Sequence, residues 1–121
     1  MTKLSPLLVA LALAGGYSLS HAQVNIQGGV LVGANGMTLY TFDKDAAGSG
    51  KSVCNGACAT NWPPLTATMA PSGEGYSLIK RDDGAQQVAY KGKPLYYWSK
   101  DAKPGDRTGD GFNNAWRAAM P

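Results

Sequence analysis

Two cysteines four positions apart, Cys54 and Cys58, are the residues whose types and spacing most directly suggest chemistry in this 121-residue chain. In an oxidising compartment such a pair forms a disulfide, because the two Cα atoms can approach the ~5.5–6 Å that the bond needs. As free thiols, the same pair could act in redox chemistry or hold copper(I), which accepts cysteine and methionine sulfur. The spacing therefore predicts a Cys54–Cys58 disulfide, and a redox or copper-handling role is the alternative.

The segment from Asp106 to Gly111 partly matches a calcium-binding loop. Asp106, Thr108 and Asp110 fall at positions 1, 3 and 5 of such a loop, and a glycine follows at position 6. Position 12, where the loop needs a bidentate glutamate, is Arg117. We therefore expect a turn held by side chain-to-backbone hydrogen bonds here, and we predict no bound metal and no cofactor.

The only histidine, His21, lies in a segment that we expect to be absent from the secreted protein. Residues 1–22 combine a basic start, an apolar run over residues 7–14 and small residues at the last and third-last positions before a cleavage site after Ala22. This is the plan of a secretory signal peptide. A chain that begins at Gln23 contains no imidazole, which removes the commonest general base and metal ligand. We therefore expect no catalytic residues and no enzymatic activity.

Residues 23–121 suit a single secreted domain of mild charge. Without Lys3, ten Lys and Arg residues stand against eight Asp and Glu residues, which leaves a net charge of +2. This charge is small and dispersed, so we expect no nucleic-acid partner. The apolar run near the N-terminus is too short to span a bilayer core of ~30 Å, and the residue directly after Ala22 is Gln23, not a cysteine. We expect no membrane span, no lipid anchor and a periplasmic or secreted location.

A near-repeat in the sequence indicates how the remaining polar and aromatic residues are positioned. TLYTFDKD, residues 38–45, returns as PLYYWSKD, residues 94–101, and each copy is followed by a Gly-rich loop and a tryptophan. This matched order of features indicates an internal duplication, with repeats at about residues 33–65 and 89–121. The residues of the repeated motif are Tyr40, Asp45 and Trp62 in the first copy, and Tyr96, Asp101 and Trp116 in the second.

Turn signals divide the two repeats into short strands. Asn35-Gly36 and the segment 82–84 are the clearest of these turns. Short helical turns are expected at residues 55–61 and 113–120. The expected strands cover residues 29–34, 37–43, 76–81, 86–90 and 93–99. The fold class that follows is mainly β, a small antiparallel domain built from two tandem repeats with short helical turns.

The repeated aromatic residues have two interpretations. Alternation along a strand places Tyr40 and Phe42 on one face, and Tyr96 and Trp98 on the equivalent face of the second repeat. These faces would pack as a core shared by the repeats, or they would form a repeated binding surface. The aspartate that ends each motif could accept backbone hydrogen bonds and hold the loop that follows it.

The motif can be written Tyr-x4-Asp, and it runs from Tyr40 to Asp45 and from Tyr96 to Asp101. It is flanked by VCNGACATNWPPL in the first repeat and PGDRTGDGFNNAW in the second. In these features the chain, from about Gly33 to Pro121, resembles a bacterial family of secreted repeats often labelled predicted lipoproteins. The resemblance implies an extracytoplasmic β-rich domain. We therefore expect a non-enzymatic binding or structural protein of the cell envelope, with an unidentified envelope or extracellular partner.

Overall fold

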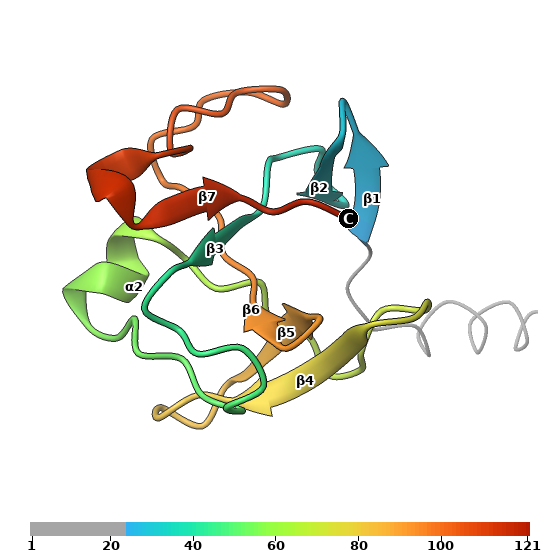
Figure 1. Ribbon diagram of the computed structural model, residues 1–121, viewed down its shortest axis with the longest axis vertical. Helices are drawn as coiled ribbons and strands as arrows, with labels where there is room; N and C mark the ends of the chain where they lie inside the picture. Colours follow the sequence, from blue (N-terminus) through green and yellow to red (C-terminus); the bar gives the residue numbers. More distant parts are fainter. Residues whose placement is uncertain (1–23) are drawn as a thin grey trace, which may run out of the picture.

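The computed structural model describes residues 24–121, which contain seven short strands and two helical turns joined by longer loops (Figure 1). The predicted signal peptide, residues 1–22, lies outside the described residues. The strands form three small antiparallel sheets, so the mainly β, antiparallel class predicted from the sequence is confirmed. The elements are β1 (Val24–Gln27), β2 (Val30–Gly33), β3 (Tyr40–Phe42), α2 (Ala57–Asn61), β4 (Tyr76–Lys80), β5 (Gln86–Tyr90), β6 (Lys93–Pro94), η1 (Phe112–Asn114) and β7 (Trp116–Ala118).

Strand β2 pairs with β1, a strand that the sequence patterns did not predict. Gly28 and Gly29 join the two strands with φ angles of 59° and 84°, which glycine adopts without steric cost. On its other side β2 meets the segment after the Asn35-Gly36 turn, where the Leu39 N–H donates to the Leu31 carbonyl at 2.9 Å. The predicted hairpin around Asn35-Gly36 therefore exists, and β1 extends it.

The second repeat builds the same arrangement from β4, β5 and β6. β4 and β5 pair antiparallel with Leu78 opposite Val88, and β5 continues through the turn at Lys91-Gly92 into β6. The Leu95 N–H donates to the Val88 carbonyl at 3.0 Å, which reproduces the bond between Leu39 and Leu31. The two repeats therefore have matching hairpins.

The last strand of each repeat pairs with the motif strand of the other repeat. β7 lies antiparallel to β3 with Trp116 opposite Phe42, and Figure 1 shows the two strands side by side in the upper half of the molecule. In the other half Tyr96 bridges Pro64, and the Tyr97 N–H donates to the Pro63 carbonyl at 2.7 Å. Prolines lack an N–H, so this second contact remains a bridge and not a full ladder. The two repeats are thus interlocked.

The predicted helical turn over residues 113–120 is present as far as Asn114 and wrong beyond it. The 3₁₀ turn η1 ends at Asn114, and residues 116–118 form β7, in which Trp116 and Ala118 are buried and the residue between them is exposed. This alternation is that of a strand with one face on the core, and pairing with β3 overrides the local helical signal. The other predicted helical turn, at residues 55–61, contains α2.

The buried hydrophobic residues form two core clusters. One is mostly aromatic and contains the tyrosines and tryptophans of the motif. The other is aliphatic and draws equivalent positions from both repeats, namely Leu31, Leu39, Leu65, Val88, Leu95 and Ala119. Each cluster needs both repeats, so neither repeat buries its own apolar residues alone.

Candidate functional site

The motif tyrosines and aspartates form hydrogen bonds between the two repeats. The Tyr40 hydroxyl donates to Asp101 Oδ2 at 2.6 Å, and the Tyr96 hydroxyl donates to Asp45 Oδ2 at 2.5 Å. Each tyrosine therefore contacts the aspartate of the other motif. Both tyrosines have no exposed surface, and Asp45 is 1% exposed. Because these groups are buried and paired with each other, they join the repeats.

The second oxygen of each aspartate holds the loop that follows. Asp45 Oδ1 accepts the Val53 N–H at 2.7 Å. Asp101 Oδ1 accepts both the N–H and the hydroxyl of Thr108, at 3.0 and 2.6 Å. Each carboxylate thus fastens its own loop with one oxygen and the opposite repeat with the other, which is the loop-holding role that the sequence suggested.

Burial raises the pKa of the Tyr40 hydroxyl well above its usual value, and its hydrogen bond to Asp101 adds to the effect. Burial also raises the pKa of the Tyr96 hydroxyl, again assisted by its bond to an aspartate, here Asp45. A phenolate in either place would lie against a carboxylate without water to solvate it. Both hydroxyls therefore stay protonated at neutral pH and act as hydrogen-bond donors.

The tryptophans of the motif stack on each other at the centre of the aromatic cluster. The rings of Trp62 and Trp116 are parallel with centroids 3.7 Å apart. Trp98 stacks on the outer face of this pair at 3.9 Å from Trp62, and Phe42 stacks at 4.2 Å from Trp116. Because Trp62 and Trp116 are 3% and 4% exposed, the structure places these rings in the core and not on a binding surface.

Arg81 is a buried residue that the sequence reasoning did not select. The residue is 3% exposed. Its Nη1 donates to Ser52 Oγ at 2.9 Å and to Gln87 Oε1 at 2.8 Å. Ser52 also bonds the Tyr96 hydroxyl at 2.6 Å, so Arg81 reaches Asp45 through two intervening side chains. Arg81 precedes a polar turn, where a charged residue is normally solvated, and no local pattern signals its burial.

Cys54 and Cys58 lie at disulfide distance, with 2.06 Å between the sulfur atoms and 5.2 Å between the Cα atoms. No free cysteine remains in the described part of the chain. The backbone carbonyl of Cys54 accepts a hydrogen bond from Arg81 Nη2, and that of Cys58 accepts one from the Trp62 N–H at 2.8 Å. The bridge therefore ties the loop after β3 to the buried arginine and to the aromatic stack.

The segment that resembles a calcium loop uses its carboxylates for other bonds. Asp106 Oδ2 accepts the N–H groups of Ala102 and Lys103 at 2.8 and 3.1 Å. Asp110 Oδ1 accepts the N–H of Ala118, the last residue of β7, at 3.0 Å. Across residues 24–121 no group of three or more His, Cys, Asp or Glu side chains is arranged to hold a metal ion. The turn with side chain-to-backbone bonds matches what the sequence predicts.

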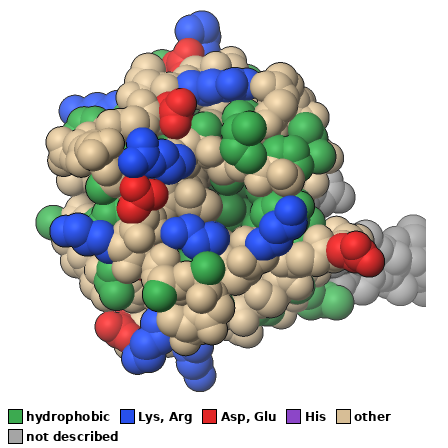
Figure 2. All heavy atoms as spheres, in the orientation of Figure 1, with side chains coloured by type: hydrophobic (Ala, Val, Ile, Leu, Met, Phe, Trp, Pro, Cys, Tyr) green, Lys and Arg blue, Asp and Glu red, His purple; other side chains and the backbone are tan. Residues whose placement is uncertain are grey.

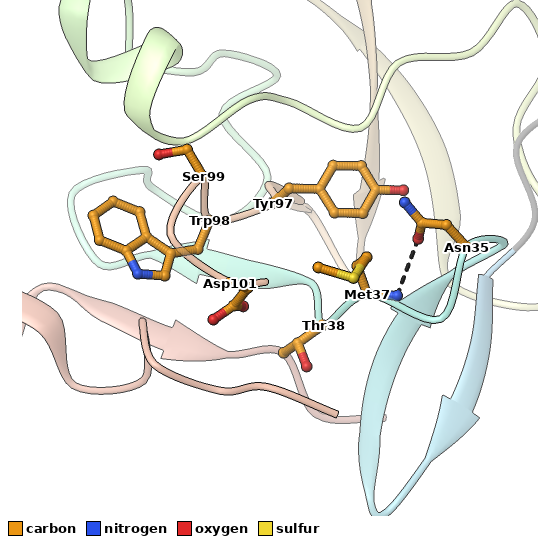
Figure 3. A pocket seen from close by; sticks show the side chains of 7 residues that line it. All are labelled: Asn35, Met37, Thr38, Tyr97, Trp98, Ser99 and Asp101. Carbon is orange, nitrogen blue, oxygen red and sulfur yellow. Dashed lines mark hydrogen bonds between the residues drawn. The ribbon is translucent and has the colours of Figure 1, made fainter. Parts of the chain in front are cut away.

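A surface pocket of about 190 Å³ lies where the two repeats meet (Figure 3). One wall comes from the turn between β2 and β3, and the other comes from the end of the second motif. Figure 3 shows the Met37 side chain between Tyr97 and Asp101, with Asn35 bonded to the Met37 backbone at 3.0 Å. The residues that line the pocket are Asn35, Met37, Thr38, Tyr97, Trp98, Ser99 and Asp101.

The charged side chains do not form a single patch. Figure 2 shows Lys and Arg side chains spread over one face, with acidic side chains between several of them. The ion pairs within residues 24–121 are exposed or partly exposed, as for Arg117 and Asp43 at 2.9 Å. Within the same residues, no helix is long and apolar enough to cross a membrane.

Comparison with protein families finds one described as a secreted repeat of unknown function, which matches residues 24–66 and 77–120. The two matched segments are the interlocked repeats seen in the structure, and each contains one copy of the Tyr-x4-Asp motif. Neither the curated proteins nor the solved structures contain a significant match to the chain.

Proposed function

This chain belongs to the family of secreted repeats of unknown function, and we propose on that basis that it is a non-enzymatic binding and structural protein of the cell envelope. The observation that supports the proposal is the reciprocal bonding of the two motifs. The Tyr40 hydroxyl donates its hydrogen bond to Asp101, and the Tyr96 hydroxyl donates its own to Asp45. The tyrosines and aspartates repeated in this chain thus hold its two halves together, which suits a rigid scaffold better than a reaction centre.

A location in the periplasm or outside the cell is part of the proposal. The Cys54–Cys58 bridge fits an oxidising compartment, because cytosolic proteins keep their thiols reduced. The scaffold leaves the pocket beside Met37 and the exposed loops as the surfaces that a partner could reach.

The copper-handling or redox alternative gains no support from the cysteine geometry. Copper(I) binding by Cys54 and Cys58 needs both sulfurs as free thiolates, and here they are joined to each other. The carbonyls of both residues also hold the fold together, through Arg81 and Trp62. We therefore retain the binding and structural role as the single proposed function.

A cosedimentation assay tests this role. The secreted form of the protein, labelled at its amino groups, is mixed with isolated envelope material from the producing cells and centrifuged. We expect saturable cosedimentation that unlabelled folded protein competes away and that heat-unfolded protein does not. Failure to sediment at any protein concentration would exclude an envelope-binding role.

A further inference from the structure

The pocket beside Met37 has a counterpart in the other repeat that is already filled. Met37 and Lys93 hold the same place in their repeats, three residues before the tyrosine of the motif. The matching hairpins and the exchanged last strands relate the two halves by an approximate two-fold axis. Each residue of the pocket can therefore be compared with its equivalent on the filled side.

On the filled side, the ammonium group of Lys93 supplies a cation. Lys93 Nζ donates to the backbone carbonyls of Phe42 and Asp45, at 3.1 and 3.0 Å. These two residues end the first motif, and a turn in which the Asp45 N–H donates to the Phe42 carbonyl at 3.0 Å holds them together. The chain thus places a primary ammonium group against the end of one motif.

On the pocket side, the same turn exists without the ammonium. The Asp101 N–H donates to the Trp98 carbonyl at 3.1 Å, as in the first motif. The residue that reaches towards this turn is Met37, whose thioether cannot donate a hydrogen bond. Among the described residues Asp101 is part of no ion pair, although it is 9% exposed and accepts three hydrogen bonds.

We propose that this pocket binds a small molecule that carries a primary ammonium group, in the position that Lys93 fills on the other side. The inference rests on the proposed binding role, because it names the class of ligand. The carbonyls of Trp98 and Asp101, by equivalence with those of Phe42 and Asp45, accept the N–H bonds, and the Asp101 carboxylate lies beside them.

The walls of the pocket favour a short alkyl chain behind the ammonium group. Met37 on one wall and the rings of Tyr97 and Trp98 on the other give apolar surface (Figure 3), and an aromatic ring also attracts a cation that lies over its face. The pocket volume of about 190 Å³ suits a molecule of lysine side-chain size. A carboxylate or phosphate ligand would meet the like charge of Asp101, so the pocket favours a cation over an anion.

Titration of the folded protein with n-butylammonium chloride, followed by NMR, tests the inference. We expect saturable shifts at the pocket residues, with a dissociation constant on the order of 1 mM for so small a ligand. Tetramethylammonium, which has no N–H, and sodium chloride serve as controls for charge and ionic strength. Shifts that fail to saturate, or equal shifts with tetramethylammonium, would overturn the proposal.

The variant Met37→Lys supplies a matched test, because its ammonium group should occupy the pocket as Lys93 does on the other side. We expect affinity for n-butylammonium to fall at least about tenfold and the thermal midpoint to be unchanged or higher. Met69→Lys is the control. It adds the same charge as Met37→Lys, but at a residue that is 52% exposed and lies outside the pocket. Unaltered binding by Met37→Lys would rule out this site.

The reverse substitution, Lys93→Met, should create a second pocket. We expect a lower thermal midpoint that n-butylammonium restores, and a stoichiometry of two amines per chain where the native protein binds one. A destabilised variant that amines do not rescue would contradict the equivalence of the two sites. Cosedimentation with envelope material is measured on the same preparations. Native protein that cosediments but binds no amine contradicts only the ligand inference, whereas protein that does not cosediment contradicts the envelope-binding role.

Discussion

Tyr40 and Tyr96 pair with each other across the centre of the molecule, each N–H donating to the other's carbonyl, at 2.7 and 2.9 Å. The approximate two-fold axis passes between them. From this shared position their side chains diverge, and each hydroxyl reaches the aspartate at the end of the opposite motif. The repeated motif therefore joins the two repeats, because the tyrosine of each copy bonds the aspartate of the other copy.

A double-mutant cycle should detect this cross-repeat coupling. We expect Tyr40→Phe and Asp101→Ala together to cost less than the sum of the single changes, with a coupling energy of about 1–2 kcal/mol, because the Tyr40–Asp101 hydrogen bond is lost in all three variants. Urea unfolding measures the free energies. Tyr40→Phe with Asp45→Ala is the control pair, within one motif, and should be additive. Coupling within a motif and none across would contradict the structure.

Stability should fall in alkaline solution because of the buried tyrosines. Tyrosines in the unfolded chain lose their protons near the ordinary pKa of 10.0, whereas burial raises the pKa of Tyr40 and Tyr96 in the folded chain. The unfolded state then binds fewer protons, so the free energy of unfolding decreases as pH rises above about 10 and is unaffected by these groups below it.

Urea unfolding of native protein and Tyr40→Phe from about pH 8 to 11 measures this dependence. We expect a shallower decrease for the variant, because one of the two buried hydroxyls is gone. Identical slopes for native protein and Tyr40→Phe would show that the Tyr40 pKa is not raised.

Cleavage between the repeats should leave them associated. Glu74 is the only glutamate in the chain and lies in an exposed loop between Thr66 and β4. A glutamate-specific protease should cut there, and the two fragments should elute together on size exclusion, because β3 pairs with β7 and each core cluster draws on both repeats. Urea should separate them. Fragments that part in native buffer would refute the interlocked arrangement.

Removing the Arg81 side chain should be strongly destabilising. Arg81→Ala leaves the Gln87 and Ser52 oxygens and the Cys54 carbonyl without their buried donor, so we expect a loss of about 3 kcal/mol. Arg107→Ala, at an exposed arginine that donates to the Gly28 carbonyl, is the control and should change stability by less than about 1 kcal/mol. Chemical denaturation at neutral pH compares the two, and equal small effects would show that the buried network contributes little.

Breaking the disulfide should destabilise the fold modestly. The Cys54–Cys58 bridge closes a loop of only a few residues, so its removal should lower the free energy of unfolding by about 2 kcal/mol. The Cys54→Ser/Cys58→Ser double variant and reduced native protein should agree in a denaturant titration. Before reduction, neither cysteine should react with an alkylating reagent in denaturant; modification of both would mean that the bridge is absent.

Local sequence patterns determined much of the fold. The duplication could be read from the recurring Leu-Tyr motif, and the turns at Asn35-Gly36 and residues 82–84 follow from the backbone freedom of their residues. Cys54 and Cys58 had only each other as disulfide partners. These features depend on residues close together in the sequence, where propensity and spacing are sufficient guides.

Only the tertiary structure decided which repeat each motif bonds. Because the two motifs are nearly identical, each tyrosine could bond the aspartate of its own motif or that of the other motif. Spacing in the sequence therefore cannot predict that Tyr40 bonds Asp101, 61 residues away. Pairing with β3 likewise makes residues 116–118 a strand where a helical turn was expected, and hydrogen bonds to Ser52 and Gln87 hold Arg81 in the interior. The difference between Met37 and Lys93 is visible in the sequence, but its consequence, one filled position and one pocket, depends on how the repeats pack against each other.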